Sequence, residues 1–496
     1  MTDPTAAEAL KAPISDGRAR LESDVGDPFL KRGPRLLLLV PWFAMGGADK
    51  FALDLMGALT KRGWEITVAS TSEGSDEWAP LFRAATPDVF SMHRFLPPHD
   101  FPRFLAYLIR SRTVDTVMIM HSELGYRLLP FLRHHFPNVT FVDSLHVVEP
   151  SWLGGGFPRL AVDYREHLDL SIAASEQVRH WMVAQGADPL RVGVSHLSID
   201  TQSVRTDPDV RRATRLAHGA DTEIPVILFA GRICDQKQPL VLADTISRLS
   251  RRCPEFVVWI AGDGPDLPLL RAALRFNGIR DTVRLLGPVP PLAIPQLMAA
   301  ADILFLPSRY EGIATVLFEA MAAGLPVVSA DVGGQRELVT DDCGILIAAN
   351  HPGLEAERYT DALASLLADR DLRTTMGGAG RLRVQSHFRP EAMGSRLVNL
   401  LDHATAERST NPLPQVASTL ADSSLGRAME LLGGAHPSQR SWRKSRRRAI
   451  GVWMHSHLNR VLAPAYHWGV VRGWRWLPSV GKRIRRMLLG SQRPRA

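Results

Sequence analysis

The 496-residue sequence has few cysteines and no long apolar run. Its three cysteines, Cys234, Cys253 and Cys343, lie far apart, so they suggest neither a disulfide framework nor a metal-ligand spacing. This usage fits a reducing cytoplasm. Because no window of about 18 residues is apolar and uncharged, we expect no transmembrane helix. The first residues also lack the apolar core of a signal peptide, and 1–33 are expected to be a flexible leader.

Two common nucleotide-binding patterns are missing as well. No GxGxxG sequence follows the first predicted strand, 35–41, which argues against a dinucleotide enzyme. Gly46 and Gly47 come after that strand, but the spacing to a Lys-Ser/Thr pair that defines a P-loop is absent. Glycines still let backbone N–H groups approach a ligand closely. The pair therefore indicates either a binding loop or an ordinary tight turn.

Negative charge is absent from the C-terminal end. Residues 437–496 hold 15 Lys and Arg, five of the eleven Trp and no Asp or Glu. Apolar residues recur there at helical spacing, from Ile450 to Leu462 and from Val480 to Leu488. A basic amphipathic helix with tryptophans is typical of a membrane-surface element, so 436–496 are expected to bind an anionic membrane. Packing against the rest of the chain and nucleic-acid binding through the aromatic rings are the alternatives.

Strand and helix patterns alternate along the chain in two series. The predicted strands are 35–41, 65–70, 114–120, 139–144 and 169–173, then 226–230, 256–261, 282–286, 302–306 and 326–329. This alternation predicts a doubly wound sheet in each half. The polar stretch 206–224 is expected to be a hinge between the halves. Residues 405–435, rich in Ser, Thr, Pro and Gly, are expected to be a linker before the basic tail.

The segment from Pro307 to Glu319 carries the main functional signal. It follows the predicted strand 302–306 and enters a helix expected from Ala314 to Gly324. With Glu311 in the loop and Glu319 in the helix, the free N–H groups of the first turn form an anion site between two carboxylates. Carboxylates suit hydroxyl groups, so the segment predicts a sugar-nucleotide site. An amphipathic helix with two solvated acids is the alternative.

Two cations favour the sugar-nucleotide interpretation. Arg232 follows the predicted strand 226–230, and Lys237 comes five residues later. A fork-shaped cation and a point cation at the carboxyl end of a strand suit a diphosphate. Ligands of open parallel sheets bind at that edge.

Five motifs, taken together and in this order, resemble the retaining glycosyltransferases of family 4, which have the GT-B fold. They are Phe229–Arg232 with Lys237, Ile260–Pro265, Val283–Gly287, Ser308–Gly312 with Glu319, and Gly324–Val328 with Gly333 and Gly334. The resemblance implies an α/β fold of two Rossmann-like, doubly wound domains facing a cleft, 34–205 and 225–404. A late helix of the second domain is expected to return to the first. The motifs span most of 225–345, and the N-terminal half matches more loosely.

The resemblance also implies an activity. A retaining enzyme of this family moves a hexosyl unit from a nucleoside diphosphate sugar to a hydroxyl of a glycan or lipid-linked glycan. Cell-surface polysaccharide synthesis on the inner face of the cell membrane is the expected setting. A nucleotide-sugar 2-epimerase and an inactive GT-B scaffold are the alternatives. The sequence leaves uracil, guanine and adenine donors open.

The expected site residues follow from the same resemblance. Arg232 and Lys237 would neutralise the diphosphate, and Glu319 would hold the ribose hydroxyls. Glu311 would hold donor-sugar hydroxyls and stabilise the oxocarbenium-like state, with His146 near that sugar. The remaining donor-binding residues are expected to be Gly46, Gly47, Gly312, Ile313, Ala314 and Thr315.

One metal-like pattern carries no such expectation. Asp207-Pro-Asp209 has the spacing of a metal-binding DxD, but no predicted strand precedes it. We therefore expect neither a metal nor a cofactor. The charge of the leaving group would then fall to the two cations and the helix N-terminus.

Overall fold

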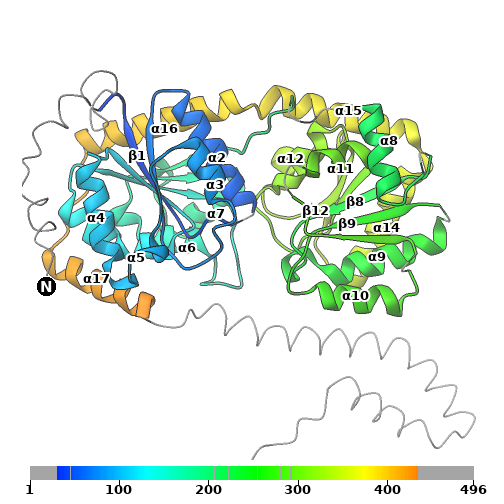
Figure 1. The fold of residues 1–496 in the computed structure, drawn as a ribbon, viewed down its shortest axis with the longest axis horizontal. Coiled ribbons are helices and arrows are strands. Elements are labelled where there is room, and N and C mark those ends of the chain that lie inside the picture. Colours follow the sequence, from blue (N-terminus) through cyan, green and yellow to red (C-terminus); the bar gives the residue numbers. More distant parts are fainter. Residues whose placement is uncertain are drawn as a thin grey trace, which may run out of the picture. The chain divides into compact units, whose positions relative to one another are not determined.

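The computed structural model describes residues 31–433 apart from 45, 203, 205, 206, 222, 254, 280, 291 and 292 (Figure 1). The expected leader, except its last three residues, and the expected basic tail lie outside the described residues. Two parallel sheets, one of seven and one of six strands, form the body of this part of the chain.

The first sheet has the strand order β3-β2-β1-β4-β5-β6-β7. Its strands are β1 Arg35–Val40, β2 Glu65–Ser70, β3 Val89–Ser91, β4 Thr116–Met120, β5 Thr140–Leu145, β6 Leu170–Ala173 and β7 Val192–Val194. Leu36 and Leu38 join one apolar core, whereas Leu37 and Leu39 join another. Both faces of β1 are therefore covered, which is why this strand is a continuous apolar run.

Helices cover both faces of the first sheet. They are α2 Gly47–Thr60, α3 Ala79–Ala85, α4 Phe101–Ser111, α5 Glu123–His135, α6 Phe157–Asp163 and α7 Glu176–Ala184. Serine side chains cap two of them, because Ser122 accepts from the Gly125 N–H and Ser175 from the Val178 N–H. Short 3-10 turns occur at Met92–Arg94, Pro98–Asp100, Arg165–His167 and Pro189–Arg191.

The second sheet has the strand order β10-β9-β8-β11-β12-β13. Its strands are β8 Val226–Ala230, β9 Val257–Ala261, β10 Val283–Gly287, β11 Ile303–Leu306, β12 Val327–Asp331 and β13 Gly344–Ala348. Its helices are α8 Pro208–Ala217, α9 Pro239–Arg252, α10 Leu267–Phe276, α11 Ile294–Ala300, α12 Thr315–Ala322, α13 Gln335–Leu338, α14 Pro352–Ala368 and α15 Arg370–His387. The strand order reverses between β8 and β11, the position at which doubly wound sheets bind ligands.

The stretch 206–224, expected to be a hinge, contains the helix α8. This helix packs on α11, and its Arg215 is buried, pairing with Asp302 at 3.1 Å. Arg211 pairs with the same carboxylate at 2.6 Å. The charges that made the stretch look like a solvated connector therefore attach it to the second sheet.

The prediction of a linker over 405–435 is wrong for most of that range. The helix α16, Pro390–Thr410, packs on α2, β5 and β6 of the first sheet, as the expected return helix, and extends beyond residue 404. The helix α17, Ser418–Gly433, then packs along α5. Ala421, Ser424 and Ala428 are buried there. Small side chains let two helices approach closely, so the composition that suggested a linker belongs to a packing face.

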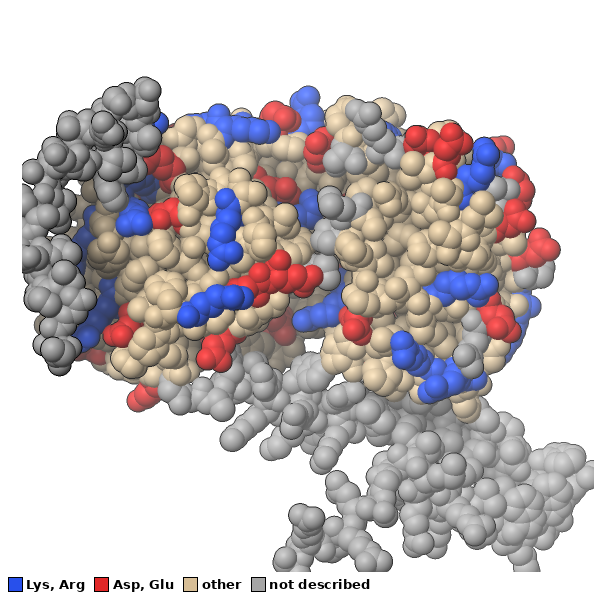
Figure 2. All heavy atoms as spheres, in the orientation of Figure 1, with Lys and Arg blue, Asp and Glu red and all other residues tan. Residues whose placement is uncertain are grey.

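Charge is mixed on the surface of the described residues. Figure 2 shows basic and acidic side chains interspersed on this face, without a large field of either sign. Among these residues, no helix is long and apolar enough to cross a lipid bilayer.

Candidate functional site

The N-terminus of α12 lies at the edge of the second sheet where β11 ends. Ala314 precedes this helix and supplies no side-chain cap. The first N–H groups of any helix lack the partner that later turns provide. The Leu317 N–H donates to the Ala314 carbonyl at 3.0 Å, so Thr315 and Val316 carry the donors that a ligand could use. Ile313 and Ala314 are buried, which shields this turn from bulk water. The arrangement suits an anion.

Glu311 lies in the loop before α12 and is only 7% exposed. Lys237, in the 3-10 turn Asp235–Lys237, forms an ion pair with its Oε1 atom. Gln236 Nε2 donates to the Tyr310 carbonyl at 3.0 Å and lies 3.4 Å from Glu311 Oε2. The carboxylate and cation for which we expected separate ligands thus contact each other.

Arg232 lies two residues after the end of β8 and is exposed. Within the part of the chain that the structure describes, its side chain has no hydrogen bond or ion pair. An exposed guanidinium at the carboxyl end of a strand is available to a ligand. Its planar guanidinium can form two parallel hydrogen bonds to the oxygens of a phosphate.

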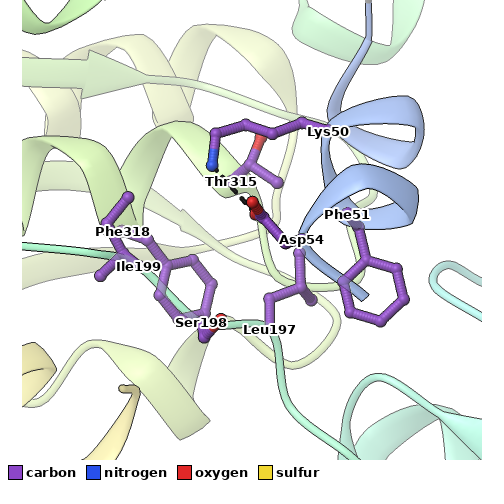
Figure 3. Close-up of a pocket in the computed structure, with 8 residues that line it drawn as sticks. All are labelled: Lys50, Phe51, Asp54, Leu197, Ser198, Ile199, Thr315 and Phe318. Carbon is purple, nitrogen blue, oxygen red and sulfur yellow. Dashed lines mark hydrogen bonds and ion pairs between the residues drawn. The ribbon is translucent and has the colours of Figure 1, made fainter. Parts of the chain in front are cut away.

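Glu319 lies in the second turn of α12 and is partly buried. Burial raises the pKa of its carboxyl group, while Lys50 lowers it and Asp54 raises it. Both of these residues lie on α2, beside the first sheet. They line a pocket together with Phe51, Leu197, Ser198, Ile199, Thr315 and Phe318 (Figure 3). Residues from both sheets therefore build the surroundings of Glu319.

The predicted glycines lie where the two sheets meet. A Cβ at Gly47 would lie 2.9 Å from Thr315 Oγ1, at the start of α12. A Cβ at Gly312 would overlap the carbonyl oxygen of His146. Gly46 is the residue before α2 and supplies no side-chain cap. The structure thus brings Gly47, His146, Gly312 and Thr315 together, with backbone in close approach.

His146 follows β5 and lies within an aromatic cluster. Its ring packs edge-on against Phe51, with centroids 4.6 Å apart, and against His121 at 4.7 Å. Ser144 Oγ lies 3.2 Å from its Nε2 atom. Burial, and then the neighbouring His121, lower the pKa of His146 well below its ordinary value. His146 is therefore a neutral imidazole near pH 7.

Sequence reasoning missed several polar residues of this region. His121 follows β4 with a φ of 54°, and burial lowers its pKa to about 4. It comes after a strand, so the strand-end rule used for His146 could have found it. Asp49 lies in the first turn of α2, and burial raises its pKa to about 7. Lys50 and Asp54 carried no signal, because alternating charges on a helix usually face solvent.

The Asp207-Pro-Asp209 pattern has a structural explanation. Asp207 caps α8, with its Oδ1 accepting the Asp209 N–H at 2.8 Å. Asp209 lies 3.7 Å from Arg212. Among the described residues, no group of three or more His, Cys, Asp or Glu side chains could hold a metal ion.

Two sequence-family models match the chain in tandem. Glycosyltransferase Family 4 matches residues 45–203, and Glycosyl transferases group 1 matches residues 210–383. Together they take in about two thirds of the 496 residues.

Curated relatives carry names of sugar transferases. A GDP-mannose-dependent alpha-(1-6)-phosphatidylinositol monomannoside mannosyltransferase of Mycobacterium tuberculosis is 31% identical over 42% of this chain and 55% of its own length. The chain thus matches about half the length of that relative. A D-inositol 3-phosphate glycosyltransferase of Xylanimonas cellulosilytica is 27% identical over 76% of this chain and 98% of its own.

Solved structures confirm the expected GT-B fold. Anabaena HepE, crystallised in complex with UDP, superposes with a TM-score of 0.63 at 20% identity, covering 75% of this chain and 100% of its own. This likeness concerns the fold alone. The two family models, each on its own sheet, show that the chain belongs to family 4 of the glycosyltransferases, with a group 1 domain in its second half.

Proposed function

We propose that this protein is a retaining glycosyltransferase that moves a hexosyl unit from a nucleoside diphosphate sugar to a hydroxyl group. One observation carries the proposal. Glu311 and Glu319 flank the uncapped first turn of α12, and Arg232 and Lys237 lie beside the adjoining strand β8. Carboxylates that can accept hydrogen bonds from sugar hydroxyls and cations that can bind a diphosphate thus follow neighbouring strands of the second sheet, which suits a sugar nucleotide.

The diphosphate is the part of the donor that the site would neutralise. Arg232 would bind it through its free guanidinium, and the first-turn N–H groups of α12 would add their partial positive charge. Lys237 forms an ion pair with Glu311. It would therefore contact both the diphosphate and the residue assigned to the donor sugar. These fixed donors would stabilise the charge that develops on the leaving phosphate.

The sugar would lie between Glu311 and His146. Gly312 lies directly against the His146 carbonyl, which brings the loop that carries Glu311 close to His146. The neutral imidazole can bind a sugar hydroxyl without adding positive charge beside an oxocarbenium-like state. With no other base assigned, the leaving phosphate would accept the proton of the incoming hydroxyl.

We further propose that the acceptor is a glycan or a lipid-linked glycan at the inner face of the cell membrane. Two facts support this. The names of the relatives include a phosphatidylinositol mannoside and an inositol phosphate, both polyols. The C-terminal 60 residues carry 15 cations and no acid, which suits an anionic lipid surface.

A two-step assay tests the proposal. Thermal-shift measurements with UDP, GDP and ADP sugars would first identify the donor, because a ligand of the native state raises its melting temperature. Incubation of that donor with membrane extract should then yield a glycosylated product with the donor's anomeric configuration. Turnover to an epimer without an acceptor would favour a 2-epimerase instead. Donor binding without turnover would favour an inactive scaffold.

A further inference from the structure

A charged cluster crosses the joint between the two sheets. Lys50 and Asp54 lie one turn apart on α2, with Lys50 Nζ 3.2 Å from Asp54 Oδ2. Thr315 and Phe318 of α12 line the same pocket, and Glu319 is the next residue of that helix. In Figure 3, Lys50 and Asp54 meet beside Thr315. Lys50 therefore pairs with Asp54 on α2 and also lowers the pKa of Glu319, whose helix α12 lines the same pocket.

The surroundings in this cluster disfavour the ionised forms of Asp54 and Glu319. Burial raises the pKa of both Asp54 and Glu319, and each also responds to Lys50, which lowers it. Asp54 opposes the ionisation of Glu319, and Asp200 opposes that of Asp54. Lys50 and Asp54 keep 36% and 40% of their side chains exposed, so solvent weakens these effects. What distinguishes the cluster is its position, since Lys50 and Asp54 line one pocket with the helix that carries the carboxylate assigned to the ribose.

We propose that Lys50 is a positioning residue for the donor. Asp54 and Glu319 compete for the ammonium group of Lys50. This inference rests on the proposed function. A ribose hydroxyl donates to Glu319 best when the carboxylate is ionised, and Lys50 supports that form. Asp54 disfavours the ionised form of Glu319 in two ways. Its own negative charge repels the carboxylate, and it holds the ammonium group of Lys50. Lys50 and Asp54 therefore affect donor binding in opposite directions.

An isolated helix pair would behave differently. A Lys and an Asp spaced by four residues stabilise a surface helix by a small amount. Loss of either partner would then lower the stability of the protein. Neither loss would alter the affinity for a nucleotide. Tighter nucleotide binding on loss of the Asp54 charge is therefore expected from the proposed competition and not from an isolated helix pair.

Calorimetry with UDP, GDP and ADP provides the test. Lys50→Gln should weaken binding of the nucleotide that the wild type prefers by about fivefold, the scale of one partly screened ion pair. Asp54→Asn should tighten it by about threefold on the same reasoning. Lys50→Arg, which keeps the charge, should restore most of the affinity. Lys61→Gln, an exposed lysine at the end of the same helix, is the matched control and should change nothing. Weaker binding in both Lys50→Gln and Asp54→Asn, or changes no larger than in the control, would overturn the inference.

A second measurement needs no nucleotide. Thermal unfolding of Lys50→Gln, Glu319→Gln and the double variant should give non-additive shifts, because the two side chains interact across the joint. If wild-type protein binds none of UDP, GDP and ADP while this coupling is present, the proposed function fails but the interaction between Lys50 and Glu319 is confirmed. Additive shifts would reject the cluster itself, whatever the nucleotide result.

Discussion

The carbonyl oxygen of His146 lies directly against the Cα atom of Gly312. His146 follows β5 of the first sheet, and Gly312 lies in the loop between β11 and α12 of the second. No side chain can stand between them, because even a methyl group at position 312 would overlap the carbonyl. Glycine is therefore required here for the close approach of two backbones, and that approach brings Glu311 to the His146 side of the site.

Gly312→Ala should separate donor binding from turnover. The added methyl group would push the two loops apart, while the α12 N-terminus, Arg232 and Glu319 would stay in place. A misplacement of about 1 Å between reacting groups can cost about 100-fold in rate, so turnover should fall by that order. Calorimetry should find the affinity for the nucleoside diphosphate within about threefold of wild type, well under the 1.4 kcal/mol that a tenfold change represents.

Gly57→Ala is the control for this experiment. Gly57 lies on α2, and a Cβ there would meet nothing within 4 Å. Alanine in a helix interior should stabilise the protein slightly and leave turnover unchanged. Full activity in Gly312→Ala would show that the contact with His146 is not needed for catalysis.

Arg232→Ala and Lys237→Ala should differ in stability although both should weaken donor binding. Arg232 is exposed and unpartnered within the described residues, so its loss leaves the fold unchanged. Lys237 is paired with Glu311, and the two side chains are only 14% and 8% exposed. Its removal would leave a buried carboxylate without a cation, at a cost of about 1–3 kcal/mol.

Thermal unfolding of four proteins checks this difference. Arg232→Ala should melt near the wild-type temperature and Lys237→Ala below it. The double variant Lys237→Ala, Glu311→Gln should recover part of the loss, because a neutral amide needs no counter-ion. Equal melting temperatures for the two single variants would contradict the importance of the ion pair.

The predictions for the second sheet depended on local sequence patterns, which the tertiary structure did not override. The strands near 226–230 and 302–306, and the loop-then-helix reading of Glu311 and Glu319, follow from apolar runs that end in Gly, Pro and polar residues. The strands β3, β7 and β13 were missed. For β3 and β7 the reason is their length, because three residues carry too little periodicity. The pairing of Lys237 with Glu311 joins residues 74 positions apart, and sequence spacing does not report such a contact.

The helix α17 shows a different limit. Its Ser, Thr, Gly and Ala residues are common in linkers, and they are also the residues that allow two helices to pack closely. Only the opposing surface of α5 decides between the two outcomes, and that surface lies almost 300 residues earlier. The same reasoning applies to Arg215 in α8, whose burial depends on Asp302.

Glu337 should connect the two sheets in a pH-dependent way. Its carboxylate, on α13, accepts the Glu176 N–H at 2.8 Å and the Gln177 N–H at 2.9 Å, at the start of α7. His196 Nε2 lies 2.7 Å from the same group. Burial raises the pKa of Glu337, but the hydrogen bonds from His196 and the two backbone N–H groups together lower it below its usual 4.5.

The sign of the pH effect follows from that lowered pKa. The ionised carboxylate stabilises the folded protein above pH 4.5, and this contribution disappears as pH falls through the folded pKa below it. Glu337→Gln should therefore lower the melting temperature at pH 7 and approach the wild-type value at pH 3. A deficit that is the same at both pH values would show that loss of charge is not the cause.

Two truncations should separate α17 from the basic tail. Leu425, Leu431 and Leu432 of α17 pack against the core that contains α5, so α17 is part of the folded body. Ending the chain after residue 435 should leave a stable protein that still binds donor. Ending it after residue 411 would expose the apolar face of α5 and should cost roughly 3 kcal/mol or more, the scale for burying several leucines.

The same truncations test the membrane prediction for residues 436–496. Full-length protein should float with anionic vesicles and less with neutral ones, and salt should release only part of it, because charge and apolar burial act together. The form ending after residue 435 should not float, and it should work poorly on a lipid-linked acceptor while its donor affinity is unchanged. Equal flotation of the two forms, or indifference of the full-length protein to anionic lipid, would rule out a membrane anchor and favour packing of the tail against the body.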